Sequence, residues 1–423
     1  MGKRHTPYLG LHFSLGARLA ARLGAWSNAI RQQLALPLRI ELWDGQRIDF
    51  SAQPPRVTIR VPSMAAASYL LRPSLASLGS AYVEGRIEVQ GAARDMIDIV
   101  TALARNTLKA EGRYARVVRN WRHSKRGDAD AIHYHYDVSN EFYAAFLDPQ
   151  LVYSCAYFEQ GHEDLATAQQ QKIDHILRKI ALQPHQRLLD IGCGWGALVI
   201  RAAQRFQARC VGVTLSEQQY ALARQRVRAA GLEHLVEIRL QDYRDVQGQF
   251  DRITNVGMFE HVGVRHLPEY FATVARLLAE DGIVMNHGIT SSDPANGQSP
   301  YGGGDFIEQY VFPQGELAHI GHVLKCMQQG QLEVFDVENL RRHYARTCAH
   351  WSDNFEAAAG RLKALAGEKR FRIWQVYLAG SSYAFEQDWI SLYQIVARKA
   401  GQPASTLPWS RRYMYTAAAS GLA

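Results

Sequence analysis

Three glycines at alternate positions are the strongest chemical signal in the sequence, because they stand directly after a short apolar run. The run ends at Asp190, and Gly192, Gly194 and Gly196 follow it in Asp190-Ile-Gly-Cys-Gly-Trp-Gly196. Glycine lets the backbone approach a ligand closely, and the free N–H groups at the start of a helix attract its polar parts. The spacing differs from the Gly-x-Gly-x-x-Gly of dinucleotide-binding loops. An ordinary tight turn would not require three glycines, so we predict a cofactor loop of another kind.

Such a loop needs a strand before it and a helix after it, and the sequence supplies both repeatedly. From residue 185 onward, apolar runs alternate with amphipathic segments, which is typical of a doubly wound parallel sheet with helices on both faces. Residues 290–385 break the alternation, and we expect a mostly helical cap there, followed by a closing strand at 392–397. The predicted strands are residues 187–191, 210–215, 236–240, 252–256 and 282–286, and the predicted helices are residues 197–206, 217–230 and 267–279.

The glycine loop resembles the first motif of the class I S-adenosylmethionine-dependent methyltransferases, in which it wraps the methionine and ribose of the cofactor. The resemblance implies an α/β fold and makes Asp190 and the three glycines cofactor-binding residues. In this class an acidic residue usually follows the second strand, whereas hydroxyl and amide side chains, which can also hydrogen-bond a ribose, stand there in this chain. The other cofactor contacts that the resemblance implies are Thr214, Ser216 and Gln219 after the second strand, and Asp242 and Tyr243 near the adenine after the third.

Several further stretches are similar to the cyclopropane fatty acid synthases and to their relatives that modify mycolic acids. They run from about residue 130 to the C-terminus, and their combination is more specific than any single one. The resemblance implies that Tyr153 and Ser154 also contact S-adenosylmethionine. The stretches are His135-Tyr-Asp-Val-Ser-Asn140 with Tyr153-Ser-Cys-Ala-Tyr157, the glycine loop with Val213-Thr-Leu-Ser216, Gln241-Asp-Tyr-Arg-Asp245 with Val256-Gly-Met-Phe-Glu-His-Val-Gly263, and Tyr310-Val-Phe-Pro-Gln-Gly315.

The resemblance also implies a reaction with strict demands on the site. An alkene within an acyl chain attacks the sulfonium methyl group, a carbocation forms in an apolar pocket, and one methyl proton leaves as the ring closes. In this family bound bicarbonate is the base, and its site is made by the positions that match Cys155, Glu260, His287, Tyr344 and the backbone N–H of Ile289. We expect His287 to orient Glu260 and to share its proton.

Each of these residues also has a purely structural interpretation. Taken alone, Cys155 is a small core residue, His287 a strand-end histidine with a satisfied hydrogen bond, and Tyr344 an aromatic residue on a helix face. Glu260 is harder to explain in this way, because it closely follows a strand of the cofactor-binding sheet. The glycine-rich residues 297–304 are longer than the matching loop of the best-known synthases. We expect a lid there that affects substrate identity before reaction type.

The formal charge of +8 is concentrated in the first third of the chain. Residues 1–130 contain 20 Lys and Arg against 10 Asp and Glu. A solvated helix face and an anionic membrane surface are both open interpretations, and nucleic acid ranks last because no recognised motif accompanies the charge. We predict a basic, membrane-associating α+β domain over residues 1–125 and a catalytic domain over 126–423. The densest part, whose first members recur every three or four positions, is Arg105, Lys109, Arg113, Arg116, Arg119, Arg122, Lys125 and Arg126.

Composition and cysteine usage restrict the remaining classes. The chain has 423 residues, 47% apolar and 21% charged, which is typical of a folded protein with a sizeable core. We expect neither a membrane-spanning helix nor a signal peptide. The five cysteines are widely spaced without a Cys-x-x-Cys pair, which favours a reducing compartment and argues against a metal site. We therefore expect a cytoplasmic protein, peripheral at the inner face of the membrane, that takes unsaturated phospholipid; the resemblance allows a homodimer.

The leading hypothesis is an enzyme that adds a methylene from S-adenosylmethionine across a cis double bond of phospholipid acyl chains. The second keeps fold and cofactor but gives a branched or methylidene chain, because the carbocation has more than one exit. A lipid-binding scaffold would have lost the glycine loop or the base site, and both are intact. A nucleic-acid methyltransferase is the poorest alternative, because Asn255-Val-Gly-Met258 lacks the Asn/Asp-Pro-Pro-aromatic motif of the DNA enzymes that methylate amino groups.

Overall fold

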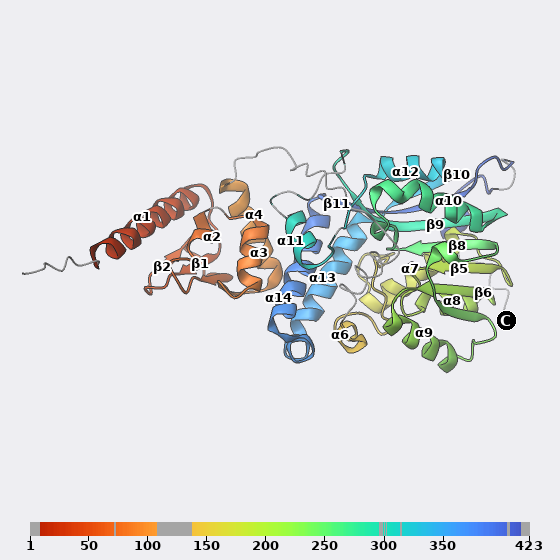
Figure 1. Ribbon diagram of the computed structural model, residues 1–423, viewed down its shortest axis with the longest axis horizontal. Coiled ribbons are helices and arrows are strands. Elements are labelled where there is room, and N and C mark those ends of the chain that lie inside the picture. Colours follow the sequence, from red (N-terminus) through yellow and green to blue (C-terminus); the bar gives the residue numbers. More distant parts are fainter. Residues whose placement is uncertain are drawn as a thin grey trace, which may run out of the picture.

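The computed structural model describes residues 9–71, 73–107, 138–295, 299, 301, 303–313, 315–403 and 407–415. They form a smaller and a larger part that lie end to end along the longest axis of the molecule (Figure 1). The predicted boundary at residues 125 and 126 lies outside the described residues, as does most of the predicted basic stripe. No helix among the described residues is both long enough and apolar enough to cross a membrane.

The smaller part packs helices against a four-stranded sheet of order β2-β1-β3-β4, which confirms the predicted α+β domain. Leu38 and Ile40 of β1 and Val57 and Ile59 of β3 alternate with more exposed residues, so they fill the core on one face of the sheet. The elements are α1 (Leu9–Gln33), β1 (Leu38–Glu41), β2 (Arg47–Asp49), β3 (Val57–Arg60), α2 (Ser68–Leu71), α3 (Leu75–Val83), β4 (Glu88–Gln90) and α4 (Ala93–Thr107).

The larger part is built on a seven-stranded sheet of order β10-β11-β9-β8-β5-β6-β7. Strand β11 runs antiparallel to both of its neighbours, and the other six strands share one direction. The predicted doubly wound α/β sheet is confirmed, with this one reversed strand. The strands are β5 (Arg187–Ile191), β6 (Arg209–Thr214), β7 (Val236–Leu240), β8 (Phe250–Val256), β9 (Leu278–Ser291), β10 (Leu332–Asn339) and β11 (Ile390–Lys399).

Helices cover both faces of this sheet, and a helical layer separates it from the smaller part (Figure 1). One face packs against α7 (Leu165–Lys179), α8 (Ala197–Phe206) and α9 (Glu217–Ala229). The other face packs against α10 (Leu267–Leu277) and α12 (Ile320–Gln329). The layer between the two parts contains α11 (Gly303–Tyr310), α13 (Arg341–Ala357) and α14 (Ala359–Glu386). The remaining helices are α6 (Asn140–Ala144) and α15 (Arg412–Tyr415), and the 3₁₀ turns are η1 (Tyr243–Asp245), η2 (Phe259–His261) and η3 (Val264–His266).

The prediction of a mostly helical cap over residues 290–385 needs two corrections, although most of the described residues there are helical. Within that range α12 belongs to a helical layer of the sheet, and β10 is the edge strand of the sheet itself. β10 pairs along its length with β11, which lies more than fifty residues later in the chain, so no local pattern identifies it as a sheet strand. The predicted closing strand at 392–397 is confirmed as the central part of β11.

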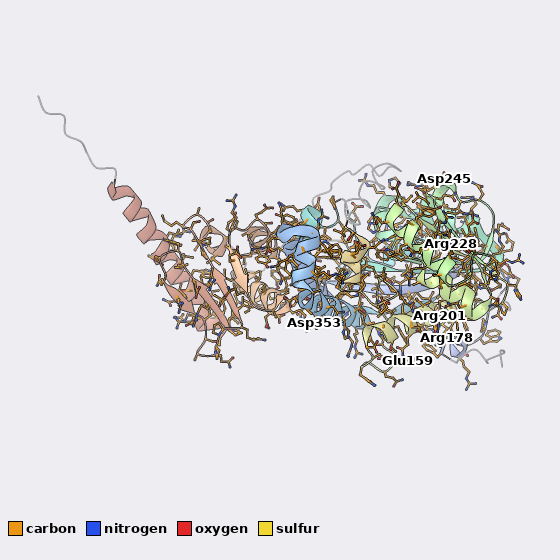
Figure 2. All side chains as sticks on the ribbon, turned by 90° about the horizontal axis from the view of Figure 1, so that it is seen from below. Glu159, Arg178, Arg201, Arg228, Asp245 and Asp353 are labelled. Atoms are coloured by element: carbon orange, nitrogen blue, oxygen red, sulfur yellow. The ribbon has the colours of Figure 1, made fainter. Side chains whose placement is uncertain are left out.

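The two parts meet through buried apolar clusters and through polar side chains that contact α14 and α13. The hydroxyl of Tyr82 donates to the side-chain oxygen of Gln375 at 2.7 Å, and Arg94 pairs with Asp353 at 3.1 Å. Asp353 is labelled at this junction in Figure 2. Arg105, the one member of the predicted stripe that the structure describes, donates to Gln387 at 3.2 Å and lies over the ring of Trp389. It therefore contacts the larger part, although the residue stays exposed.

Candidate active site

The glycine loop lies at the carboxyl end of β5, where the predicted strand-to-helix turn is confirmed. Gly192, Gly194 and Gly196 all have positive φ, at 80°, 54° and 84°, a conformation that residues with a Cβ rarely adopt. Asp190 is buried just before the turn and accepts a hydrogen bond from the hydroxyl of Thr254 at 2.7 Å. Burial raises the pKa of Asp190 to about 6, against the lowering effect of that hydrogen bond.

A pocket opens over this loop at the carboxyl edge of the sheet, and most of the predicted cofactor residues line it. The exceptions are Gly196 and Ser216, which begin α8 and α9 instead. The Ser216 hydroxyl accepts the backbone N–H of Gln219 at 3.3 Å, and the hydroxyl of Thr214 donates to the Gln219 side chain at 2.8 Å. Gly196 and Ser216 therefore begin the two helices beside the pocket and do not line it. The predicted residues in the wall are Tyr153, Ser154, Asp190, Gly192, Gly194, Thr214, Gln219, Asp242 and Tyr243.

Helix α7 supplies two site residues that the sequence did not reveal. Gln169 donates to the backbone oxygens of Val152 and Ser154 at 3.1 and 2.8 Å, which fixes the segment that carries the predicted contacts. Lys172, only 2% exposed, lines the pocket and donates to the Ser154 hydroxyl at 2.7 Å. The available signal was a lysine on the apolar stripe of an amphipathic helix, seven residues before a second one at Lys179.

Glu260 lies deeper, on the turn η2 that follows β8. Its Oε1 accepts the backbone N–H of Ile289 at 2.7 Å. This N–H lies within β9, just past His287, the last residue of β9 that pairs with β8. Gly288 makes this approach possible, because a Cβ there would lie 2.0 Å from the ring of Phe259. Burial raises the pKa of Glu260 to about 7, and its Oε2 has no partner among the described residues. The structure therefore provides a buried carboxyl that can hold or release a proton near neutral pH.

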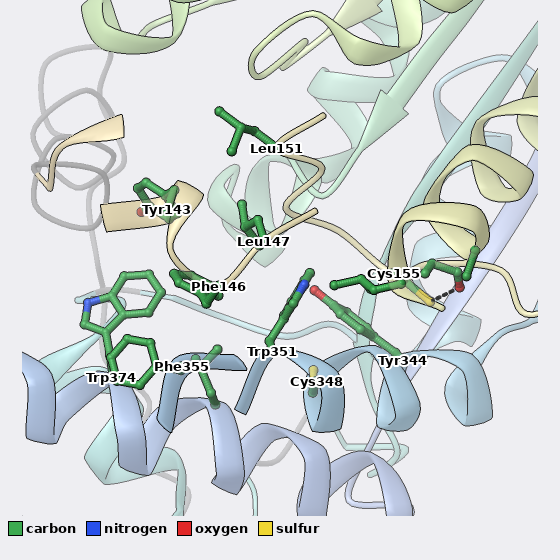
Figure 3. Close-up of a cluster of buried hydrophobic side chains, with 14 of the residues drawn as sticks. Tyr143, Phe146, Leu147, Leu151, Cys155, Tyr344, Cys348, Trp351, Phe355 and Trp374 are labelled. Carbon is green, nitrogen blue, oxygen red and sulfur yellow. Dashed lines mark hydrogen bonds between the residues drawn. The ribbon is translucent and has the colours of Figure 1, made fainter. Parts of the chain in front are cut away.

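Tyr344 lies near both Glu260 and Cys155. Figure 3 shows Cys155, Tyr344 and Trp351 side by side in the buried cluster. Burial raises the pKa of Tyr344 and of Cys155 well above their usual ranges, and the neighbouring Glu260 and Cys155 charges act in the same direction on Tyr344. The sulfur lies 3.2 Å from the backbone oxygen of Ala156 and 3.8 Å from that of Leu340, so its single S–H has an acceptor. Both residues are therefore protonated groups that can donate hydrogen bonds.

His287 has a different partner from the one predicted. Its Nδ1 lies 3.2 Å from the side-chain nitrogen of Gln394 on β11, and the backbone N–H of Ile289, not His287, orients Glu260. Burial lowers the pKa of His287 well below its usual range, and the nearby Lys172 and Lys179 add to this. The ring is therefore neutral, and its Nε2 has no partner in the described part of the chain.

Aromatic rings connect the pocket to this buried region. Tyr153 lines the pocket, and its ring lies 5.0 Å from that of Trp351 and 5.5 Å from that of Tyr143. Its hydroxyl is 3.3 Å from that of Tyr377 on α14. The labelled rings in Figure 3 come from α6 and the residue Phe146 just after it, and from α13 and α14, about two hundred residues later in the chain. Such surroundings exclude water and present ring faces that stabilise positive charge.

Known proteins share this architecture. A family model described as mycolic acid cyclopropane synthetase matches residues 123–395, and one described as a domain of unknown function matches residues 25–112. The chain is 45% identical over 387 residues to a probable fatty acid methyltransferase of Pseudomonas putida, covering 91% of this chain and 98% of that protein. It is 38% identical over 262 residues to the cyclopropane-fatty-acyl-phospholipid synthase of Escherichia coli, covering 62% of this chain and 66% of that protein.

The larger part also matches a solved structure. The crystal structure of mycolic acid cyclopropane synthase CmaA1 complexed with SAH and CTAB aligns with a TM-score of 0.62 at 34% identity, covering 64% of this chain and 98% of that one. The pocket at the glycine loop, the order of the sheet and the family match agree with one another. The chain belongs to the mycolic acid cyclopropane synthetase family and is an S-adenosylmethionine-dependent methyltransferase.

Proposed function

We propose that this enzyme adds a methylene across a cis double bond of unsaturated phospholipid acyl chains and so makes cyclopropane fatty acids. The observation that carries the proposal is the Glu260 carboxyl, whose Oε2 is buried without a partner among the described residues and whose pKa burial raises to about 7. Ring closure requires a base beside a carbocation, and a carboxyl that titrates near neutral pH is suited to that task. The E. coli relative named for this activity supports the substrate class.

Different residues of the chain serve different steps of the proposed reaction. S-adenosylmethionine, when bound, supplies an electrophilic methyl group. Tyr153 and the neighbouring aromatic rings exclude water and stabilise positive charge on the acyl chain through their faces. Glu260 accepts the departing proton, while Ile289 holds its other oxygen in place. Cys155 and Tyr344 stay protonated, so neither competes with the alkene as a nucleophile.

Bicarbonate is the other candidate for the base. The N–H of Ile289 donates to Glu260, whereas Nε2 of His287 is buried without a partner among the described residues and would be free to donate to a bound anion. We propose that the proton passes to Glu260 directly. Turnover should persist in buffers stripped of carbon dioxide and carbonate. Loss of turnover there, restored by added bicarbonate, would return the base role to bicarbonate.

A second candidate product is a methyl-branched or methylidene acyl chain. The relative that covers 98% of its own length and 91% of this chain is named a fatty acid methyltransferase, whereas the E. coli cyclopropane synthase aligns with only 62% of this chain. Methyl transfer to the alkene and proton loss are shared by the cyclopropane and methylidene routes. They differ in which carbon carries the cation when the proton leaves.

The deciding experiment incubates the purified protein with trideuteriomethyl S-adenosylmethionine and vesicles of cis-monounsaturated phospholipid. Fatty acid methyl esters are then analysed by gas chromatography and mass spectrometry. A cyclopropane product keeps two deuterium atoms and resists mild catalytic hydrogenation. A methylidene product also keeps two but takes up hydrogen, and a chain that keeps all three deuterium atoms has lost its proton elsewhere. Either of the last two results would replace the proposed product with the second candidate.

We also propose that the basic N-terminal part binds anionic membranes, since each basic residue near such a surface contributes about 1 kcal/mol. Lys109, Arg113 and Arg116 carry this proposal from the sequence. Replacing all three with Gln should weaken binding to phosphatidylglycerol vesicles and leave binding to S-adenosylmethionine unchanged. Arg105→Gln is the comparison variant, because Arg105 already contacts the larger part. Equal vesicle binding by the triple variant and the parent would refute the proposal.

A further inference from the structure

Two buried lysines stand seven residues apart on α7, and only one of them is neutralised. Lys179 is fully buried and forms ion pairs with Glu338 and, at 3.8 Å, with Asp336. Lys172 is equally inaccessible, yet no carboxylate of the described residues lies within ion-pair distance of its Nζ. Burying an ammonium without a counter-charge is costly, so such a group marks a place where a negative charge is expected.

The acidic side chains around Lys172 are already engaged elsewhere. Asp148 accepts the backbone N–H groups of Gln150 and Val152 at 2.9 and 2.8 Å. Asp190 accepts the hydroxyl of Thr254. Burial lowers the pKa of Lys172 to about 8, although Cys155, Asp148 and Asp190 act in the opposite direction. The neutral His287 also faces this region.

The unused donors of Lys172 border the cofactor pocket. An ammonium has three N–H donors, and Ser154 takes one of them at 2.7 Å. Because the Ser154 hydroxyl accepts that bond, its own hydrogen is available to donate. Both residues line the pocket. The other strong cation in the wall, Arg244, is already paired with Asp242 at 2.7 Å. Lys172 and Ser154 thus present two converging donors, one of them charged, to an anion inside the pocket.

The family resemblance already implies that Ser154 contacts the cofactor, and we propose that Lys172 joins it in binding the α-carboxylate of S-adenosylmethionine. This rests on the proposed function only through the identity of the cofactor, whose carboxylate is its one anionic group. A carboxylate accepts two hydrogen bonds side by side, which matches the two donors. Placing the carboxylate here orients the rest of the molecule along the glycine loop. Ser154 acts in direct contact with the ligand, and Gln169 keeps it there by holding the backbone of the same segment.

The test compares S-adenosylmethionine with its decarboxylated analogue by isothermal titration calorimetry. The parent protein should bind S-adenosylmethionine roughly 10- to 100-fold more tightly than the analogue, the factor expected for hydrogen bonds to a charged group. Lys172→Met should remove that preference by weakening only the binding of S-adenosylmethionine. Lys172→Arg should restore part of it. Lys179→Met, which changes the other buried lysine of the helix, should keep the preference even if it lowers the melting temperature.

Each other outcome has a definite meaning. If Lys172→Met weakens both ligands equally, the lysine only supports the fold of the pocket and the proposal is wrong. If the parent protein binds neither ligand, the cofactor assignment fails instead. Should Lys172→Met not fold, Ser154→Ala and a pH series on the parent provide the same test. Affinity for S-adenosylmethionine should then fall above about pH 8 as Lys172 loses its proton, and it should stay level in Lys172→Arg. Equal pH dependence in both proteins would overturn the proposal.

Discussion

The cofactor pocket and the buried base region differ in how their polar groups are satisfied. At the pocket, Thr214 and Gln219 line the wall and are hydrogen-bonded to each other and to Ser216 beside it. In the region of Glu260, the buried polar atoms without a partner among the described residues include Oε2 of Glu260, Nε2 of His287 and Oε1 of Gln394. The pocket is a preformed surface for a large polar ligand, whereas the base region keeps costly polar atoms in apolar surroundings.

That difference shows where function costs stability. Unpartnered buried polar atoms are expensive, and a protein retains them where they act. Burial alone raises the pKa of Glu260, against the hydrogen bond from Ile289. The apolar surroundings that make the carboxyl costly thus also make it a base that works near neutral pH. Substitutions in the two regions should therefore separate binding from chemistry.

The largest effect is expected for Glu260→Gln, which keeps the shape and the hydrogen bond from Ile289 but removes the base. Turnover should fall by roughly 10²- to 10⁴-fold, the usual contribution of a general base. The dissociation constant of S-adenosylmethionine should change by less than about threefold, because Glu260 does not line the pocket. Glu316→Gln is the matched control, since Glu316 also accepts a backbone N–H, at 3.0 Å from Val264. Comparable losses in both variants would contradict the assignment.

Gly192→Ala should weaken the binding of S-adenosylmethionine, whereas Glu260→Gln lowers turnover. The positive φ of Gly192 disfavours a Cβ by about 1–2 kcal/mol, and the added methyl would lie 3.3 Å from Cβ of Met258 in the pocket wall. We expect the dissociation constant of S-adenosylmethionine to rise at least about tenfold. Gly231→Ala carries similar backbone strain at φ 67° in open space outside the pocket, so it should lose stability without losing affinity. Equal affinities in both variants would show that the loop does not contact the ligand.

The pH dependence of chemistry should report the titration of Glu260. A protonated carboxyl cannot accept a proton, so the single-turnover rate at saturating S-adenosylmethionine should rise with pH and level off above about 7. This carboxyl binds its proton more tightly in the folded chain than in the unfolded chain. Its contribution to the free energy of unfolding therefore decreases as the pH rises. Stability should fall by up to about 3 kcal/mol between pH 4.5 and 7, and Glu260→Gln should remove that part of the slope. A rate that is flat across this range would exclude Glu260 as the base.

Local motifs explain what the sequence predicted well. The strand at 187–191, the glycines after it and the helix at 197–206 lie within twenty residues, so their spacing carries the prediction by itself. The length of β9 was underestimated, as residues 282–286 instead of Leu278–Ser291, because its pairing with β11 depends on residues about one hundred positions away. The edge strand β10 was missed for the same reason.

The side-chain partners within the site are also hard to predict from the sequence. The family resemblance assigns Glu260 and the N–H of Ile289 to one site, but their direct hydrogen bond depends on the space that Gly288 leaves for Phe259. Lys172 was overlooked because a lysine in a helix ordinarily faces solvent. The pairing of His287 with Gln394 joins two strands, and the sequence offers no spacing that links them.

The smallest effect is expected for Gln394→Leu, which removes the partner of the His287 Nδ1 and tests whether the base region needs a fixed imidazole. One buried hydrogen bond contributes about 1 kcal/mol, so we expect turnover to fall roughly fivefold while the dissociation constant of S-adenosylmethionine stays the same. Ser391→Ala is the control, because it removes the bond from Asn339 at 3.1 Å on the same strand without touching His287. If both variants lose stability alike and Gln394→Leu keeps full turnover, Gln394 only supports the sheet. A loss of turnover confined to Gln394→Leu would make it a positioning residue and extend the base region to β11.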